Sequence, residues 1–313
     1  MKNIYIASCD EQGGIYRYIF EENGTLTFKE KTSADRPMYL ALANNKIYAL
    51  LREPFNNSNE SGLISYPVNR DGSLGNASDI IPTKGIVACH LVVENEDIYC
   101  VNYLSGNAVR LPDTVVTHSG KGPHPTRQTE PHTHFVCVTH DEYVLVTDLG
   151  IDKIYTYTKD MKYVCEASVP SGHGARHLVF SDDKKYLYCA NELKSTVSVF
   201  EYNNGHLTLI DTVNALPDDF TGESTAAAIR IIEDKLYVSN RGHNSIAVFD
   251  IDGASLKLNR FIPCNGKEPR DFNIFGDILI ITNQFSDNVS VIDLKTDKVI
   301  QTIDNIKAPL CVV

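Results

Sequence analysis

The stretch SGHGARHLVFSDDKKYLYCANELKSTVSVFEYNN, residues 171–204, is followed by a second copy of its own pattern, IRIIEDKLYVSNRGHNSIAVFDID, residues 229–252. In each copy an apolar run is followed by a turn, a second apolar run that ends in Asn191 or Asn240, another turn and a third apolar run. Short apolar runs bounded by turn residues are typical of β-strands. Strand, turn, strand, turn, strand is therefore the unit that the chain repeats.

This unit recurs seven times along the chain. The second apolar runs of the seven copies can be aligned, and their successive centres are 43 to 51 residues apart. The centres are Tyr5, Tyr48, Tyr99, Leu145, Tyr188, Tyr237 and Ile280. A spacing of this size accommodates four short strands with their turns, which is one blade of a β-propeller. The sequence therefore predicts an all-β, seven-bladed β-propeller, with residues 1–313 forming a single domain.

The two ends of the chain complement one another in this pattern. Each of the other second runs is preceded by a first apolar run, but the run around Tyr5 begins almost at once. The missing first run is found at the other end of the chain, in the sequence PLCVV of residues 309–313. We therefore predict that the C-terminal residues form the innermost strand of the first blade, which closes the ring and removes a free sheet edge.

Composition limits the functions that this ring can have. The formal net charge is −11, which argues against nucleic acid as a partner, because binding to phosphates needs basic side chains. No apolar stretch approaches the ~18 residues of a membrane helix, and the start of the chain does not read as a signal peptide. The eight cysteines show no short paired spacing, which favours reduced thiols. We expect a cytoplasmic monomer that binds neither nucleic acid nor membrane.

Charged residues and histidines gather at positions that propeller geometry brings to one end of the ring. Arg176 and His177 begin a first strand, while Glu192 and Arg241 follow the ends of second strands. In a blade of alternating strand directions, the start of the first strand and the end of the second strand lie at the same rim. The loops of residues 119–134 and 213–228 join blades at that rim. The sequence thus predicts one site at one mouth of the central channel.

Several motifs resemble those of the seven-bladed propeller lactonases, a family that includes bacterial 6-phosphogluconolactonase and the fungal carboxymuconate-lactonizing enzyme. The resemblance covers essentially the whole chain. It is densest in CHL (89–91), VNY (101–103), GPHPTRQTEPHTH (122–134), ARH (175–177), ANEL (190–193), DFTGESTAA (219–227), SNRGHNSIAVF (239–249) and NQFSDNVSV (283–291). In that family, the matching site residues are a histidine of the PHxH segment, the arginine of ARH, the glutamate of NEL and the arginine of NRGH. The resemblance implies that His132 or His134, Arg176, Glu192 and Arg241 form the catalytic set.

Hydrolysis of a lactone needs a base for the attacking water and donors for the developing oxyanion. Either Glu192 or His134 can be the base. Arg176 and Arg241 can stabilise the oxyanion or clamp an anionic group of the substrate. Of the two histidines of the PHxH segment, His134 is favoured because it is interpreted as lying in register with His90 and His177. The expected substrate is a small anionic sugar lactone, most of all 6-phosphogluconolactone.

Further residues are candidates for substrate binding. Lys121 and Arg127 lie in the loop over the same rim and can bind a substrate phosphate. His90 and His177 begin inner strands and can bind substrate or merely cap the strand ends by hydrogen bonding. Glu223, in the loop before the sixth blade, is a reserve acid.

Two alternatives to a lactone hydrolase stay open. A cycloisomerase would close an unsaturated dicarboxylate into a lactone, with the arginines binding its two carboxylates. A non-catalytic propeller that binds a ligand or a protein is the second, since propellers serve many functions. The histidines 124, 132 and 134 lack the carboxylate or cysteine that would complete a usual zinc site, so we expect neither a metal nor another cofactor.

Overall fold

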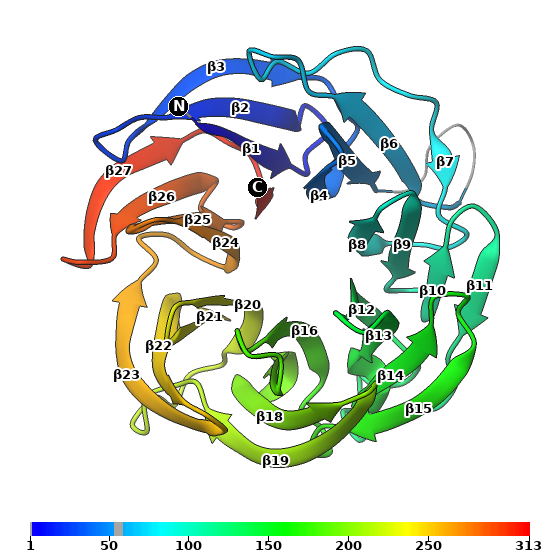
Figure 1. Ribbon diagram of the computed structural model, residues 1–313. Helices are drawn as coiled ribbons and strands as arrows, with labels where there is room; N and C mark the ends of the chain where they lie inside the picture. Colours follow the sequence, from blue (N-terminus) through cyan, green and yellow to red (C-terminus); the bar gives the residue numbers. More distant parts are fainter. Residues whose placement is uncertain (1, 53–58) are drawn as a thin grey trace.

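The computed structural model describes residues 2–52 and 59–313, which form seven four-stranded antiparallel sheets arranged in a ring (Figure 1). The predicted seven-bladed β-propeller is confirmed. Two 3₁₀ helices, η1 (Leu149–Ile151) and η2 (Glu192–Lys194), follow the second strands of blades four and five. Within the described ranges, no helix has the length and apolar character needed to cross a membrane.

Each blade has its innermost strand at the channel and its outermost strand at the perimeter of the ring. From the channel outward, blade one contains β28 (Pro309–Val312), β1 (Lys2–Ser8), β2 (Gly14–Phe20) and β3 (Leu26–Thr32). Blade two contains β4 (Pro37–Ala43), β5 (Lys46–Leu51), β6 (Gly62–Pro67) and β7 (Ile81–Pro82). Blade three contains β8 (Ala88–Glu94), β9 (Asp97–Asn102), β10 (Asn107–Arg110) and β11 (Thr114–Thr117). Blade four contains β12 (Thr133–Val138), β13 (Tyr143–Asp148), β14 (Lys153–Thr158) and β15 (Tyr163–Ser168).

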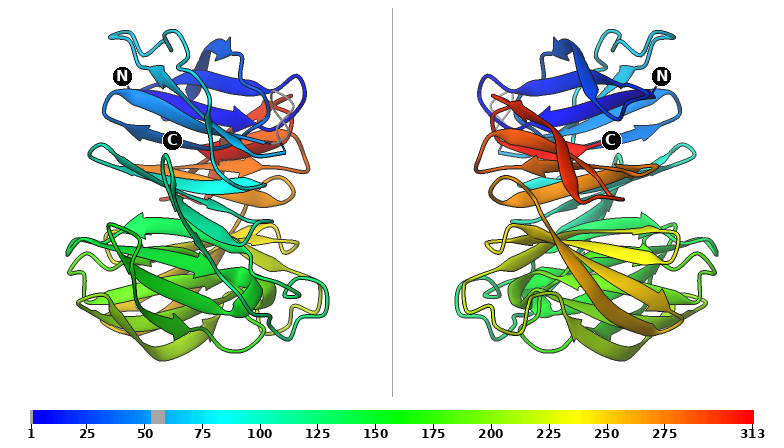
Figure 2. Two further views of the ribbon diagram at one scale, coloured as in Figure 1. Left: turned by 90° about the vertical axis from the view of Figure 1, so that its right-hand side faces the viewer. Right: turned by 90° about the vertical axis from the view of Figure 1, so that its left-hand side faces the viewer.

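The remaining three blades follow the same order. Blade five contains β16 (Ala175–Phe180), β17 (Tyr186–Asn191), β18 (Thr196–Asn203) and β19 (His206–Asn214). Blade six contains β20 (Thr225–Ile232), β21 (Lys235–Arg241), β22 (Ser245–Asp252) and β23 (Ser255–Pro263). Blade seven contains β24 (Pro269–Phe275), β25 (Ile278–Asn283), β26 (Asn288–Asp293) and β27 (Lys298–Asp304). The side views of Figure 2 show the sheets packed against one another, with the loop between β11 and β12 extending from one face.

Strand β28 closes the ring as the sequence predicts. It pairs antiparallel with β1, with Val312 opposite Ile6 and Cys311 opposite Ala7. Two further backbone hydrogen bonds join Tyr5 and Val313, at N···O distances of 2.8 and 3.0 Å. The first blade is thus built from both ends of the chain, which lie near each other in Figure 1.

The apolar core is divided into seven clusters within the described residues, each lying between two neighbouring blades. Strand β17 shows why the second strands have nearly continuous apolar sequences. Its Tyr188 and Ala190 pack towards blade six, whereas Leu187 and Cys189 pack towards blade four. Both faces of the strand are buried, so neither face needs polar residues.

Tyrosines of the second strands also link neighbouring blades by hydrogen bonds. The hydroxyl of Tyr188 donates to the carbonyl oxygen of Gly253 in the β22–β23 turn of the next blade, at 2.9 Å. Tyr5 and Tyr99 donate in the same way to Gly72 and Lys159, at 2.7 and 3.0 Å. The repeated tyrosine seen in the sequence therefore joins blades as well as filling the core.

Every innermost strand carries a β-bulge near its start. The pairing with the second strand shifts there, and one residue is left without a partner opposite, or two in β20. These bulge residues are Met38, Cys89, His134, Arg176, Ala227 with Ala228, Arg270 and Leu310. Bulges re-aim side chains and are frequent beside active sites.

The bulges correct one expectation about register. The prediction that His134 aligns with His90 and His177 is wrong. In the pairing of β12 the bulge residue is His134, so it matches Cys89 and Arg176, whereas Phe135 matches His90 and His177. The repeat in the sequence predicts the register of His134 to within one residue. The remaining error arises because the position of the bulge depends on the local backbone.

Candidate functional site

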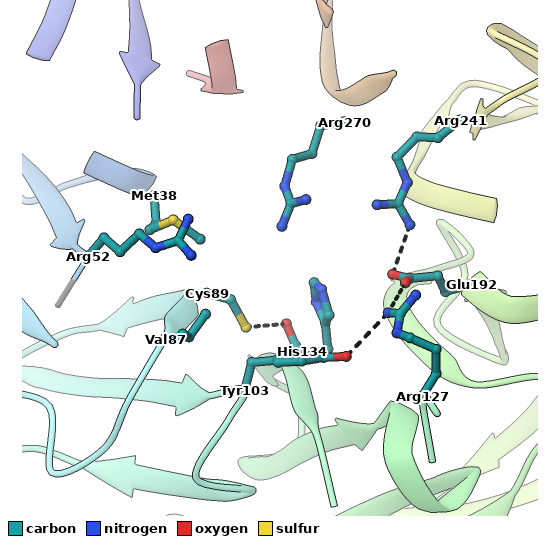
Figure 3. Close-up of a pocket in the computed structure, with 10 residues that line it drawn as sticks. All are labelled: Met38, Arg52, Val87, Cys89, Tyr103, Arg127, His134, Glu192, Arg241 and Arg270. Atoms are coloured by element: carbon teal, nitrogen blue, oxygen red, sulfur yellow. Dashed lines mark hydrogen bonds and ion pairs between the residues drawn. The ribbon is translucent and has the colours of Figure 1, made fainter. Parts of the chain in front are cut away.

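A pocket of about 270 Å³ lies at one mouth of the channel and draws side chains from blades two to seven (Figure 3). Its lining residues are Met38, Arg52, Val87, Cys89, Tyr103, Arg127, His134, Glu192, Arg241 and Arg270. Four of them are arginines and one is a glutamate, so this pocket is basic although the whole chain carries a formal charge of −11. A local excess of positive charge is what an anionic ligand requires from an acidic protein.

Two repeated positions of the blade supply eight of these ten residues. The first is the bulge of the innermost strand, which provides Met38, Cys89, His134 and Arg270. The second position lies on the neighbouring strand. It directly follows the residue that pairs with the last residue before the bulge, and it provides Arg52, Tyr103, Glu192 and Arg241. The ring brings these equivalent positions to one rim because all blades share the same strand directions.

Glu192 lies at the centre of the charged groups. It begins η2, and its backbone N–H donates to the carbonyl oxygen of Gly174 at 2.8 Å. Its Oε1 accepts from Arg127 Nη2 at 2.5 Å. Its Oε2 accepts from Arg176 Nε at 2.8 Å and lies 2.9 Å from Arg241 Nη2. One carboxylate is thus held by three guanidinium groups from different blades or loops.

The segment that leads to Arg176 is itself held by a buried carboxylate. Asp152 accepts from the backbone N–H groups of Gly172 and Gly174, both at 2.7 Å. Gly174 has a φ of +71°, and a Cβ there would lie 2.8 Å from a side-chain atom of Leu193. Glycine is therefore required both for the backbone conformation and for the close approach of η2. This arrangement fixes the bulge of β16 from which Arg176 reaches Glu192.

Burial and the neighbouring charges shift the pKa values of several groups in this cluster. Burial alone would raise the pKa of Glu192, but the charges of Arg241, Arg176 and Arg127 outweigh it and hold this pKa well below its usual range. Burial and the nearby charge of Arg241 lower the pKa of Arg176 to about 9, despite the opposing effect of Glu192. The same two causes lower the pKa of Arg270. At neutral pH, Glu192 is ionised and is consequently a weak base.

His134 presents an uncharged imidazole to the same pocket. Burial and the charge of Arg176 lower its pKa well below the usual value, although Glu192 acts in the opposite direction. Figure 3 shows its ring between Tyr103 and Glu192, pointing into the space that the arginines surround. The ring of Tyr103 packs edge-on against it, with centroids 5.8 Å apart. An unprotonated imidazole in this position can accept a proton from a bound water molecule.

Arg127 is brought over the pocket by the loop between β11 and β12. Gln128 anchors this loop by donating to Leu149 O at 2.8 Å and to Asp152 Oδ1 at 2.7 Å. Arg127 Nη2 also donates to the hydroxyl of Tyr103 at 3.2 Å. The loop therefore contributes a guanidinium whose position is fixed from two sides.

The other residues predicted for the site lie elsewhere. His132 stacks on Tyr103 with ring centroids 4.4 Å apart, and its Nδ1 is 3.0 Å from Tyr103 O, but it does not line the pocket. Lys121 and Glu223 are not among the lining residues; Lys121 is exposed and Glu223 lies at the surface of its loop. His90 and His177 are buried and do not line the pocket. Arg176 is not among the lining residues either, but it contacts Glu192.

Arg270 is the most notable residue that the sequence reasoning missed. It follows Pro269 as Arg176 follows Ala175, and both are bulge residues, so the aligned repeats contained the signal. Arg52 and Tyr103 could have been found in the same way, because they occupy the repeated position of Glu192 and Arg241. Among residues 2–52 and 59–313, no group of three His, Cys, Asp or Glu side chains could hold a metal ion.

Comparisons with known proteins agree with this geometry. The sequence pattern of the family "Lactonase, 7-bladed beta-propeller" matches residues 3–313. An uncharacterized protein of Staphylococcus aureus is 32% identical over 92% of this chain and 91% of its own. A Bacteroides uniformis protein with a provisional assignment as a 6-phosphogluconolactonase has a TM-score of 0.89 at 26% identity, over 99% of this chain and 98% of that chain. The periplasmic gluconolactonase of Pseudomonas aeruginosa shares the fold, with a TM-score of 0.89 at 24% identity and the same two coverages. The resemblance read from the motifs is confirmed, and the chain belongs to the family of seven-bladed β-propeller lactonases.

Proposed function

We propose that this protein hydrolyses a sugar lactone, with 6-phosphogluconolactone as its substrate and 6-phosphogluconate as its product. The observation that carries the proposal is the combination of a neutral imidazole, His134, with four arginines in one pocket. The imidazole supplies a base, and the arginines supply donors for an anionic substrate and for an oxyanion. The family to which the chain belongs supports the same chemistry.

In the proposed reaction, His134 takes a proton from a water molecule whose oxygen attacks the lactone carbonyl carbon. The carbonyl oxygen becomes an oxyanion that the guanidinium groups of Arg241 and Arg127 stabilise. The ring C–O bond then breaks, and the proton returns to the departing alkoxide to give a hydroxyl group. The open-chain product is a carboxylic acid, which releases one proton to the solvent at neutral pH and becomes a carboxylate.

In this proposal Glu192 is not the base, although the sequence alone leaves it as one of two candidates for that role. Its contacts with Arg127, Arg176 and Arg241 hold it ionised and make it a weak base. We therefore assign the proton transfer to His134, and assign to Glu192 the alignment of the arginines. A carboxylate that accepts from several guanidiniums fixes their planes for an incoming anion.

The phosphate of the substrate is assigned to Arg52 and Arg270. Figure 3 shows Arg52 on the side of the pocket opposite Arg127 and Glu192, and Arg270 between Arg52 and Arg241. Lys121, which the sequence suggests as a phosphate ligand, is exposed and lies outside the pocket lining. Arginine suits phosphate because its planar fork can donate two parallel hydrogen bonds.

The experiment is a panel of phosphorylated and unphosphorylated aldonolactones, with proton release measured above the spontaneous rate. Arg270→Ala should lower kcat/KM about tenfold or more for the phosphorylated lactone, since a charge-assisted contact is lost, and much less for the unphosphorylated one. Lys267→Ala removes a surface cation three residues away and is the matched control. Equal, near-spontaneous rates on every lactone would refute the assignment.

A cycloisomerase is the second candidate, and the arrangement of the arginines favours it over a non-catalytic propeller. Arginines on two sides of one pocket could bind the two carboxylates of an unsaturated dicarboxylate. Loss of muconate absorbance without any lactone hydrolysis would support this reaction. Proton release from lactones without loss of muconate would support the hydrolase.

We also place the protein in the cytoplasm and expect it to be a monomer. All eight cysteines lie in the described part of the chain and are free, which fits a reducing compartment. The likeness to a periplasmic protein makes a direct test worthwhile. Fractionation of cells that produce the protein, followed by light scattering of the purified sample, tests both points.

A further inference from the structure

A small cavity adjoins the pocket. Its volume is about 20 Å³. We call it the lower chamber, and it is lined by Met38, Tyr39, Cys89, His134, Arg176, His177, Arg270, Asp271 and Leu310. Met38, Cys89, His134 and Arg270 line both the pocket and the lower chamber, so the two spaces adjoin at these side chains.

Polar atoms of three deeply buried side chains around the lower chamber lack partners. Arg176 is 2% exposed, and His134 and His177 are each 4% exposed. Arg176 Nη1, His134 Nδ1 and both ring nitrogens of His177 have no hydrogen-bond partner among the residues that the structure describes. Leaving a buried donor unpaired costs about 1–3 kcal/mol, so several such atoms around one cavity indicate an occupant.

The chemistry of the lining identifies that occupant. A cavity needs roughly 10–15 Å³ to hold one water molecule, and a buried water needs two to four polar partners. Burial, together with the charge of Arg176, lowers the pKa of both His134 and His177 well below the usual value, so each neutral ring has one donor and one acceptor nitrogen. Asp271, Arg176 and Arg270 also line the lower chamber, so its lining carries groups of both charges. A water molecule, which both donates and accepts, matches this mixed lining.

We propose that the lower chamber binds one ordered water molecule that fixes the tautomer of His134, with His177 as a positioning residue. The water accepts hydrogen bonds from Arg176 Nη1 and from His134 Nδ1–H, and donates one to the unprotonated nitrogen of His177. His134 then carries its proton on Nδ1 and presents the lone pair of Nε2 to the pocket. The second part of this inference rests on the proposed function, because it gives His134 the role of base.

The test compares His177→Phe with the matched variant His90→Phe. His90 is equally buried and lies beside His177, with ring centroids 5.4 Å apart, but it does not line the lower chamber. In His177→Phe we expect a crystal structure without the water, mixed tautomers of His134 by ¹⁵N NMR, and a kcat about tenfold lower, as for one lost hydrogen bond, with KM unchanged. His90→Phe should keep the water, the single tautomer and kcat. His177→Gln, which retains polar atoms, should restore most of kcat.

Several results would overturn the proposal. One is a wild-type crystal structure with no water density in the lower chamber, and another is an anomalous bromide peak there in crystals soaked in sodium bromide. An unchanged His134 tautomer and kcat in His177→Phe would equally contradict it. These structural and NMR measurements need no substrate. If they succeed while no lactone is hydrolysed, the water site stands and the proposed function fails.

Discussion

Glu192 illustrates how a charged residue can be central to a site without being its base. Three arginines contact its two oxygens, and their combined charge outweighs the effect of burial on its pKa. A carboxylate this acidic has little affinity for a proton at neutral pH. Its removal would instead leave buried guanidinium groups without a counter-charge, which is costly for the folded state.

Arg241 provides the clearest test of the pocket at the level of one residue. Arg241→Ala should lower kcat/KM for lactone hydrolysis by about 10²-fold, because an oxyanion donor is lost. Lys121→Ala, which removes an exposed cation of the neighbouring loop, should leave kcat/KM within about twofold, since exposed charges contribute little. Steady-state kinetics on the preferred lactone measure both effects, and equal effects of the two changes would contradict the assignment.

The pH dependence of the reaction tests the protonation state of His134. Its pKa lies well below the ordinary 6.5, so the imidazole is already unprotonated at pH 6.5 and above. The rate should therefore be flat between about pH 6.5 and 8, and should fall only as the pH drops through the lowered pKa of the folded protein. A profile of kcat/KM, corrected for spontaneous opening, measures this. An inflection near pH 7 would mean that another group is the base.

At the scale of elements, the bulges explain what the sequence could and could not predict. The strand repeat, the closing strand and the gathering of Arg176, Glu192 and Arg241 at one rim follow from the periodicity of apolar runs and from blade geometry. A bulge adds one unpaired residue without changing that periodicity. The register predicted for His134 is therefore one residue away from its true position.

A related reason explains why Arg270 and Arg52 were not predicted from the sequence. Arg270 and Arg52 contribute to the pocket through positions that are visible only when all blades are aligned with their bulges. Neither arginine lies in one of the motifs that carry the family resemblance. The lower chamber could not be predicted at all, because the size of a cavity depends on the packing of side chains from many strands.

The hydrogen bonds between blades can be tested with a pair of tyrosines. Tyr188→Phe removes the donor to Gly253 and should lower the free energy of unfolding by about 1 kcal/mol. Tyr237→Phe is the matched change at the equivalent buried position of the next blade. Among the described residues its hydroxyl makes no such hydrogen bond to the blade that follows, so a smaller effect is expected. Urea unfolding of both variants measures the difference. Equal losses would show that the contact to Gly253 is not stabilising.

At the scale of the whole molecule, ring closure depends on a short C-terminal strand. Deletion of residues 308–313 removes β28 and exposes the edge of β1. It also removes buried Leu310, Cys311 and Val312 from the packing of blade one. We expect the truncated chain to be insoluble or unfolded, because an unpaired edge and an open ring favour aggregation. Circular dichroism and thermal melting measure this, and an unchanged melting curve would disprove the role of β28.

Acid should lower the free energy of unfolding through the buried histidines. Burial lowers the pKa values of His90, His134 and His177 well below the 6.5 of an unfolded chain. Between these lowered values and pH 6.5, the unfolded state binds protons that the folded state does not, so stability is fully present above pH 6.5 and is lost as the pH falls. Each histidine contributes a slope of up to about 1.4 kcal/mol per pH unit.

His90→Phe provides the measurement for this linkage. With one histidine removed, the loss of unfolding free energy between about pH 6.5 and pH 5 should become less steep by up to about 1.4 kcal/mol per pH unit. Urea titrations at several pH values give the slopes of the two proteins. Identical slopes would show that His90 does not take up a proton on unfolding.

The bulges have a consequence for how such a protein can change over evolutionary time. Because each bulge residue is unpaired with the neighbouring strand, its identity can be exchanged without disturbing the ladder that holds the blade together. The rim is then a set of equivalent positions, each of which can independently carry an arginine, a histidine, a cysteine or a methionine. New substrates become reachable by single replacements, and two proteins with superimposable backbones can differ entirely in what they transform.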